Sequence, residues 1–370
     1  MTKKLKVFVA MSGGVDSSVS AALLKQTGFD VTGVYMKQWS PKVLGKECIW
    51  QQERQDAMRV ANQIGIKFLT WDFSKEYEKQ VGKYMIDSYK NGITPNPDVM
   101  CNKVIKFGLF FDRAVKSGAD FIATGHYARL VVSSEVVSRK RKLQTTNYKL
   151  QTARDTSKDQ TYFLYTLNKK QLGKIIFPVG DYLKPEVRKL AKKFKLHTAE
   201  KKDSQGVCFI GPLDMKRFLK SYIKPKKGKI FSIVDTPTLR SVGVKGSVRL
   251  GEHDGVYYYT IGQRHGLDIK DGKGPYFVVK KDIRKNVIYV GKEKDLFSKQ
   301  AKIKNINWLQ KPEKFPALVD VRMRYRAPLA KARIYKNGNL VFIKPEKAIA
   351  PGQSAVFYRK NQVLGGGVII

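Results

Sequence analysis

A glycine and serine loop near the N-terminus holds the first residues that could do chemistry. Ser12-Gly-Gly-Val-Asp-Ser-Ser18 follows an apolar run over residues 5–11 and precedes a helical segment that stops at Gly28. The two glycines let the backbone turn tightly, so that free N–H groups and the positive end of the helix dipole point toward an anion. The serines add hydroxyl donors. The loop therefore predicts a phosphate site, with an ordinary glycine turn capped by serine as the alternative.

The loop differs from the commoner nucleotide motifs. It lacks the lysine of the Walker pattern, and its glycine spacing does not match GxGxxG. Asp16 falls in the first turn of the expected helix, where the helix dipole alone would satisfy a carboxylate. Beside a triphosphate, the same carboxylate is suited to a magnesium ion, because proteins usually bind magnesium with few carboxylates plus phosphate oxygens. We therefore expect ATP and Mg²⁺, and we identify no separate set of metal ligands.

Two of the three cysteines lie in loops that favour reactivity. Cys101 lies in Thr94-Pro-Asn-Pro-Asp-Val-Met-Cys-Asn102, before a helix expected to begin near Lys103, and a helix N-terminus stabilises a thiolate. Cys208 lies in the glycine-bearing stretch 202–211. A lone cysteine is more often a small buried hydrophobe, which is the alternative for both and our interpretation of Cys48. Three cysteines are too few for a disulfide framework, and none of them forms the CxxC pair of a metal site or a thioredoxin-like motif. We therefore expect a reducing cytoplasm.

The elements that must position these residues alternate in type along the N-terminal half. Apolar runs at 5–11, 31–36, 68–73 and 120–124 indicate strands, and helical periodicity separates them and returns at 184–195. Such alternation predicts an α/β fold with a doubly wound parallel sheet over residues 1–212. Within it, the basic stretch 133–149 reads as an exposed hairpin or loop.

The C-terminal half has a different pattern. Residues 213–297 begin with a basic run and continue as glycine-punctuated β-like segments, which predicts a small central domain that is mostly β. Short alternating runs divided by Pro, Gly and Asn fill residues 298–370 and predict an antiparallel β-barrel.

The net charge of the chain indicates a class of partner. Lysine and arginine total 71 against 31 acidic residues, a formal net charge of +40. A nucleic acid is the first physical expectation for so basic a chain, and a generally basic proteome is the alternative. No apolar run approaches the about 20 residues that span a bilayer, so we expect a cytoplasmic protein without a membrane.

The phosphate loop resembles that of the N-type ATP pyrophosphatases, the PP-loop superfamily. Over the whole chain, the sequence resembles the bacterial tRNA-specific 2-thiouridylase family (MnmA), whose motifs occur here in the family's order: 12–18, 96–102, 123–127, 157–164, 177–180, 203–211, 260–264 and 351–357. Three departures affect only local boundaries and details of tRNA contact: the long stretch 133–149, extra residues at 235–245, and Arg54 where an acid is commoner.

The resemblance implies a role for each matched position. Cys101 is the nucleophile, Cys208 carries a persulfide, and Asn96, Pro97 and Asp98 contact the target uracil. The ATP site is lined by Ala10, Met11, Ser12, Gly13, Gly14, Val15, Asp16, Ser17, Met36 and Gly125. A further group of residues is expected to contact tRNA or to order the active site: His126, Lys158, Asp159, Gln160, Arg324, Tyr325 and Gln353. The alternatives are a structural histidine at a strand end for His126 and a solvated barrel charge for Arg324.

The implied reaction is the replacement of a uracil oxygen by sulfur. The oxygen on uracil C2 is a poor leaving group, so its attack on the ATP α-phosphate makes a base whose departing group is AMP, with pyrophosphate released. The persulfide sulfur then attacks C2, or hydrosulfide is freed first, and a Cys101–Cys208 disulfide remains. Asp98 either assists proton transfer or holds the base.

The implied partners are tRNA and a sulfur-relay protein or cysteine desulfurase, with the enzyme acting as a monomer. The rival functions are a PP-loop ligase that amidates a small molecule, for which no ammonia source is apparent, and a noncatalytic RNA-binding protein. Pyrophosphate release that depends on tRNA separates the three.

Overall fold

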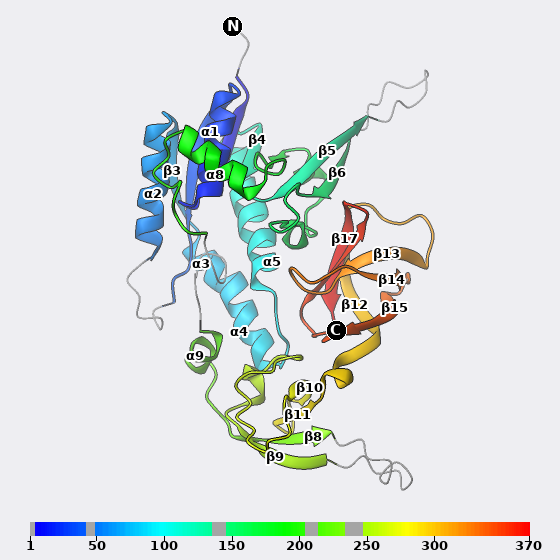
Figure 1. Ribbon diagram of the computed structural model, residues 1–370. Helices are drawn as coiled ribbons and strands as arrows, with labels where there is room; N and C mark the ends of the chain where they lie inside the picture. Colours follow the sequence, from blue (N-terminus) through cyan, green and yellow to red (C-terminus); the bar gives the residue numbers. More distant parts are fainter. Residues whose placement is uncertain (1–3, 42–48, 135–145, 204–213, 234–246) are drawn as a thin grey trace.

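A computed structural model describes residues 4–41, 49–134, 146–203, 214–233 and 247–370. The described chain forms an N-terminal α/β part, a central β part and a C-terminal barrel (Figure 1). Among the described helices, none is both long and apolar enough to cross a membrane.

The N-terminal part is built on a five-stranded sheet in the order β3-β2-β1-β4-β7, in which every pairing is parallel. Its strands are β1 (Lys6–Ala10), β2 (Asp30–Lys37), β3 (Lys67–Asp72), β4 (Phe121–Thr124) and β7 (Ile175–Ile176). The chain runs outward from β1 through β2 to β3 and then returns to place β4 on the other side of β1. Ligands of open parallel sheets bind at such a reversal, outside the carboxyl ends of the strands. The expected parallel α/β fold is confirmed.

Helices cover both faces of this sheet because the side chains of β1 alternate. Val7 and Val9 pack in one apolar cluster with residues of α1 (Val15–Gln26), α2 (Ile49–Gln63) and α8 (Lys184–Lys193). Phe8 and Ala10 face a second cluster. That cluster includes the helical stretch 74–90, formed by α3 (Ser74–Tyr77), η2 (Glu78–Gly82) and α4 (Lys83–Lys90), and the helical stretch 97–116.

The helical stretch 97–116 carries Cys101. It consists of α5 (Pro97–Cys101), the π-helical η3 (Asn102–Phe110) and α6 (Phe111–Lys116). It begins six residues earlier than the expected start near Lys103. Asn96 caps it by accepting a hydrogen bond from the backbone N–H of Val99 at 3.1 Å, and the fixed φ of Pro97 suits the first helical position. The prolines thus start the helix rather than extend the loop before it.

The central part follows α9 (Met215–Lys220). It has a four-stranded sheet in the order β10-β11-β8-β9, formed by β8 (Gly228–Ile233), β9 (Ser247–His253), β10 (Phe277–Asp282) and β11 (Val287–Gly291). The expectation of a mostly β central part is confirmed for its described residues. The extra residues at 235–245 lie outside the described ranges.

The C-terminal part is the expected antiparallel barrel. Its strands are β12 (Phe297–Trp308), β13 (Ala317–Arg322), β14 (Ala330–Ile334), β15 (Asn339–Lys347), β16 (Ser354–Arg359) and β17 (Gln362–Ile369), and pairing of β12 with β17 closes the barrel. Apolar side chains such as Val319, Ala332 and Phe357 fill it.

A hairpin of β5 (Ala128–Ser134) and β6 (Thr146–Thr152) leaves the α/β part and joins the barrel sheet, where Gln151 pairs with Gln362 of β17. The predicted hairpin is therefore present at both ends of the stretch 133–149, and residues 135–145 lie outside the described ranges.

Candidate active site

The phosphate loop lies at the carboxyl end of β1, where the strand order reverses. Gly14 precedes α1 with extended backbone, and its carbonyl accepts from the Ser18 hydroxyl at 2.8 Å. Gly13 has φ +74°, and a Cβ there would lie 2.2 Å from the carbonyl oxygen of Glu53. Both the backbone conformation and the close neighbour require glycine. The loop leads directly into the N-terminus of a 12-residue helix, which suits an anion.

The residues predicted to line the ATP site come together at one sheet edge. Ala10 ends β1, Met11 to Gly14 form the loop, and Val15, Asp16 and Ser17 form the first turn of α1. Met36 lies near the end of β2, and Gly125 follows β4. A Cβ on Gly125 would lie 2.7 Å from the Ser17 nitrogen, so β4 can approach the loop this closely only with glycine.

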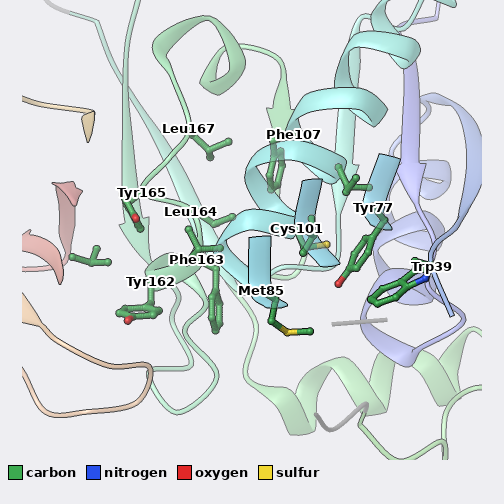
Figure 2. Packing of buried hydrophobic residues seen from close by; sticks show 14 of the residues in the cluster. Trp39, Tyr77, Met85, Cys101, Phe107, Tyr162, Phe163, Leu164, Tyr165 and Leu167 are labelled. Atoms are coloured by element: carbon green, nitrogen blue, oxygen red, sulfur yellow. The ribbon is translucent and has the colours of Figure 1, made fainter. Parts of the chain in front are cut away.

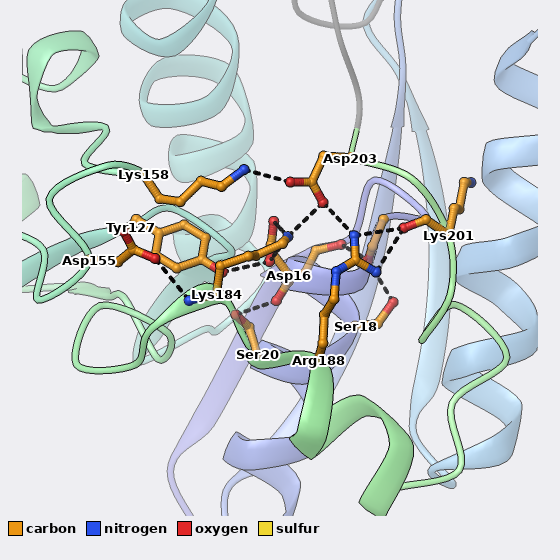
Figure 3. Close-up of polar contacts among 12 residues, drawn as sticks. Asp16, Ser18, Ser20, Tyr127, Asp155, Lys158, Lys184, Arg188, Lys201 and Asp203 are labelled. Carbon is orange, nitrogen blue, oxygen red and sulfur yellow. Dashed lines mark hydrogen bonds and ion pairs between the residues drawn. The ribbon is translucent and has the colours of Figure 1, made fainter. Parts of the chain in front are cut away.

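A network of charged side chains lies against this loop (Figure 3). The Lys184 ammonium group contacts Asp16 Oδ1 at 2.7 Å and Asp203 Oδ1 at 2.8 Å. Lys158 and Arg188 also pair with Asp203, at 2.7 and 2.9 Å. Burial raises the pKa of Asp203, but hydrogen bonds from Lys158 and Lys184 outweigh it and lower the pKa to about 2. Asp203 is therefore ionised at neutral pH.

Further contacts fix the two sides of the network. Tyr127 donates from its hydroxyl to Asp16 Oδ1 at 2.9 Å, and burial together with the charge of Asp16 raises the Tyr127 pKa, so the hydroxyl stays protonated. Lys201 donates to the Gly13 carbonyl at 3.0 Å and to Asp56 Oδ2 at 2.7 Å. The loop is thus held from α8 and from the segment that follows it.

The donor set suits a magnesium ion that arrives with a nucleotide. Asp16 presents one carboxylate at the loop, and no group of three or more His, Cys, Asp or Glu side chains with metal-binding geometry occurs within the described ranges. Phosphate oxygens and water would therefore complete the coordination, which is the usual arrangement for magnesium.

Cys101 lies in an apolar wall rather than at a helix N-terminus. Its exposed fraction is 0%, and its thiol is 3.9 Å from Gln38 Oε1. Figure 2 shows its sulfur on the side of the helix that faces Tyr77 and Trp39. Gln38 directly follows β2, so Cys101 lies beside the carboxyl end of the sheet. Because four residues of α5 precede Cys101, the expected position at the start of the helix is wrong.

The Asn96-Pro97-Asp98 segment is held by the barrel. Gln353 donates its side-chain amide to the carbonyls of Thr94 and Pro95 at 3.1 and 3.0 Å, and the Thr94 N–H donates to the Pro351 carbonyl at 3.0 Å. Gln353 and Asn96 both make hydrogen bonds that stabilise the local backbone. The predicted contacts of Gln353 with tRNA and of Asn96 with the uracil stay predictions.

The remaining predicted residues fall into two groups. Asp159 accepts from the Ala153 N–H and pairs with Arg322 at 3.2 Å, and Gln160 accepts from the Tyr127 N–H, so both order buried backbone. The side chain of Tyr325 packs on Phe163, with ring centroids 4.4 Å apart. By contrast, Arg324 is exposed at the barrel surface, and its contact with tRNA stays a prediction.

His126 is buried between aromatic rings. Its ring lies 5.8 Å from that of Phe107 and 6.3 Å from that of Phe177, and its Nδ1 is 2.8 Å from the Thr124 hydroxyl. Burial, with a smaller effect from Lys106, lowers the His126 pKa well below 6.5. The imidazole is therefore neutral at pH 7, and any contact with tRNA would be a hydrogen bond or packing rather than an ion pair.

Sequence reasoning missed Lys184, Arg188 and Lys201 as parts of the site. Lys184 and Arg188 are four positions apart and so share a face of α8, which is a weak signal of a common partner. Asp16 lies 168 positions from Lys184, and no local pattern links them. Cys208 and Cys48 lie outside the described residues.

The fold and site define a class: a PP-loop nucleotide-binding α/β protein joined to two β domains. Family models described as the tRNA methyl transferase HUP domain, the tRNA methyl transferase PRC-barrel domain and the aminomethyltransferase beta-barrel domain match residues 5–212, 216–292 and 298–369. The tRNA-specific 2-thiouridylase MnmA 2 of Geobacillus kaustophilus is 44% identical over 98% of this chain and 94% of its own. MnmA of Streptococcus mutans is 43% identical over 99% and 95%.

The chain belongs to the tRNA-specific 2-thiouridylase (MnmA) family. Among solved structures, a 4-thiouridine synthetase in complex with RNA and bound ATP matches 66% of this chain and 54% of that one, at 14% identity with a TM-score of 0.33. A likeness this weak carries no weight in the assignment.

Proposed function

We propose that this protein uses ATP to convert the wobble uridine of tRNA to 2-thiouridine, and releases AMP and pyrophosphate. The observation that carries the proposal is that the phosphate loop and the predicted nucleophile Cys101 lie at the same edge of the sheet. The phosphate loop follows β1, and Cys101 lies against Gln38, directly after the neighbouring β2. The family membership supports the same activity.

Activation comes first in the proposed reaction. The C2 oxygen of the uracil attacks the α-phosphate of ATP, the α–β bond breaks, and pyrophosphate leaves toward the loop N–H groups. Magnesium held by Asp16 and the phosphates would supply charge neutralisation for this leaving group. The segment after β4 packs closely on the loop at Gly125, which holds the loop in position. Lys201 holds it from the other side by donating a hydrogen bond to the Gly13 carbonyl.

Sulfur transfer follows. The terminal sulfur of a Cys208 persulfide attacks C2, and the C2–O bond breaks with loss of AMP. The Cys101 thiolate then attacks the Cys208 sulfur, so that the S–S bond to the base breaks and the base keeps the terminal sulfur. The result is a Cys101–Cys208 disulfide, which a thiol reductant returns to two thiols before the next turnover.

The proposed partners follow from this chemistry. A tRNA supplies a base in a single-stranded loop, where flipping the base out costs little. A sulfur-relay protein or cysteine desulfurase loads the persulfide. We place the enzyme in the cytoplasm as a monomer.

The test uses the purified full chain with ATP, magnesium, tRNA and a cysteine desulfurase with cysteine. Nucleoside mass spectrometry should detect 2-thiouridine, and AMP and pyrophosphate should form in proportion to it and only with tRNA. Formation of ADP and orthophosphate would overturn the PP-loop chemistry. Pyrophosphate release without tRNA would favour the amidating ligase, and the absence of turnover would favour a noncatalytic RNA-binding protein.

A further inference from the structure

Lys184 is the most enclosed cation at the phosphate loop. Its side chain is 10% exposed, and its ammonium group contacts both oxygens of Asp16, at 2.7 and 2.9 Å, and one oxygen of Asp203, at 2.8 Å. An ammonium group has three N–H donors, and these three contacts use them all. We propose that Lys184 is a phosphate-binding residue that exchanges Asp16 for the pyrophosphate part of ATP. This inference rests on the proposed function.

The charge balance of the network favours an incoming anion. The ion-paired side chains are three cations, Lys158, Lys184 and Arg188, and two carboxylates, Asp16 and Asp203, an excess of one positive charge (3 − 2). A third carboxylate, that of Asp155, is engaged by backbone, since it accepts from the Lys184 N–H at 2.9 Å. Lys201 is neutralised separately by Asp56. The N-terminus of α1 adds its partial positive charge at the same place. A triphosphate therefore meets three converging sources of positive potential: the helix end, the loop N–H groups and this cluster.

The contacts allow the exchange without a change of fold. If the Asp16 carboxylate turns to a magnesium ion, Lys184 loses two of its three contacts and phosphate oxygens can replace them. Asp203 keeps Lys158 and Arg188, so it stays neutralised while Lys184 moves. Arg188 also donates to the carbonyls of Ala199 and Lys201, which holds the backbone around Asp203 in place. Only the side chains of Asp16 and Lys184 need to shift.

A purely structural ion pair would behave differently. It would stabilise the free protein, and its loss would affect all ligands of the site alike or none. A phosphate-binding lysine instead distinguishes ligands that carry phosphates from those that do not. Lys189 provides a matched control, because it lies on α8 with Lys184 but is exposed to solvent.

Calorimetric binding of α,β-methylene ATP with magnesium tests the proposal, because that analogue cannot be cleaved between the α- and β-phosphates. Lys184→Met should weaken its binding at least about tenfold, which corresponds to the loss of one charge-assisted contact. Adenosine should bind the variant as it binds the wild type, and Lys189→Met should match the wild type for both ligands. Lys184→Arg should recover part of the analogue affinity because it keeps the charge.

Thermal unfolding without ligand reports the structural part of the effect. If Lys184→Met does not fold, Lys184→Gln, which keeps a hydrogen-bond donor for the carboxylates, serves in its place. Unchanged analogue affinity in the folded variant, or equal losses for the analogue and for adenosine, would overturn the phosphate role. A wild-type protein that does not bind the analogue would instead count against the proposed function.

Discussion

Cys101 has no exposed surface. A thiol packed against aromatic rings is protected from unwanted oxidation, but neither a uridine nor a persulfide can reach it without rearrangement of its neighbours. Side chains around it must therefore move before sulfur transfer. Gln38 is positioned to take part, because its side-chain oxygen lies 3.9 Å from the thiol and its amide nitrogen is buried without a hydrogen-bond partner in the described part of the chain.

The two cysteines should fail at different steps when each is replaced. Cys208→Ser should abolish thiolation and the productive persulfide, while tRNA-dependent adenylation survives because the phosphate loop is untouched. Cys101→Ser should still accept sulfur at Cys208 but stop at transfer, because a serine hydroxyl cannot resolve an S–S bond. Mass spectrometry of both variants after incubation with a cysteine desulfurase checks this. Formation of 2-thiouridine by Cys208→Ser without added sulfide would refute the carrier role.

Asp203 should make stability depend on pH only in strong acid. Its pKa is lowered from 3.8 to about 2 in the folded protein, so its pairing stabilises the fold above pH 3.8 and is lost as the pH falls from 3.8 toward 2. Thermal unfolding of wild type and Asp203→Asn should differ most near neutral pH, and the difference should shrink below pH 3.8 and vanish as the pH falls to about 2. Exposed Asp112→Asn is the control and should track the wild type throughout. A difference that persists undiminished at pH 2.5 would mean that Asp203 acts through packing rather than charge.

The carboxyl ends of β1, β2 and β4 together define the nucleotide edge of the sheet. Parallel strands end at the same edge, so three separate sequence segments deliver the loop, Met36 and Gly125 to one place. Glycine is required where two of these segments touch, because Gly125 packs directly on the backbone of Asp16 and Ser17.

Gly125→Ala should therefore damage ATP use with little effect elsewhere. Its Cβ would lie 2.7 Å from the Ser17 nitrogen and 2.8 Å from the Asp16 carbonyl carbon, and backbone atoms cannot move aside as a flexible side chain can. We expect pyrophosphate formation to fall by about 10- to 100-fold, because misplacement of reacting groups by about 1 Å can cost about 100-fold in rate. Gly251→Ala in β9 has open space around its Cβ and should be neutral. Equal rates for the two variants would show that the loop tolerates displacement.

Three parts of the chain meet at the segment that precedes α5. The Thr94 hydroxyl is 3.1 Å from that of Thr260 in the central part, Gln353 of the barrel holds the next carbonyls, and Gly92 packs on Ile283. Binding of tRNA to either β domain can therefore affect the segment that carries Asn96 and leads to Cys101. The barrel and central parts therefore hold the segment that leads to Cys101.

The basic run of the central part should bind the tRNA backbone. Lys224, Lys226, Lys227 and Lys229 are exposed, and Asn286 fixes the backbone by donating to the carbonyls of Lys226 and Lys227 at 3.0 and 2.8 Å. Replacing these four lysines with alanine should reduce the slope of log Kd against log salt by about 3, since each phosphate contact contributes about 0.7–0.9.

The other basic residues of the predicted run provide the comparison: Lys216, Arg217 and Lys220. Lys216 and Lys220 share Asp254 at 3.4 and 2.8 Å, so their double replacement should reduce the slope by less than the about 1.4–1.8 expected for two phosphate contacts. Filter binding of tRNA across a salt series measures both slopes. Equal slopes for the wild type and the four-lysine variant would make the run a solvated face.

Local patterns in the sequence determined the element types, the phosphate loop, the barrel and the family. Strand and helix periodicity, glycine at a strand end and turn residues between short strands all act over a few neighbouring residues, so they can be read directly. The start of α5 is equally local, since Asn96-Pro97 is a helix cap. The prediction of an extended loop there is wrong because Pro97 suits the first helical position.

Tertiary structure alone decided how distant residues combine. The pairing of Asp16 with Lys184, the burial of Cys101 against Gln38 and the joining of β6 to the barrel connect positions 168, 63 and 211 (362 − 151) apart. Ion pairs and packing depend on which surfaces the fold brings within a few ångströms, and sequence spacing carries no information about that distance. The sequence therefore identifies the phosphate loop and the cysteines of the proposed reaction. Packing determines which cation faces the phosphate loop and how far the thiol lies from solvent.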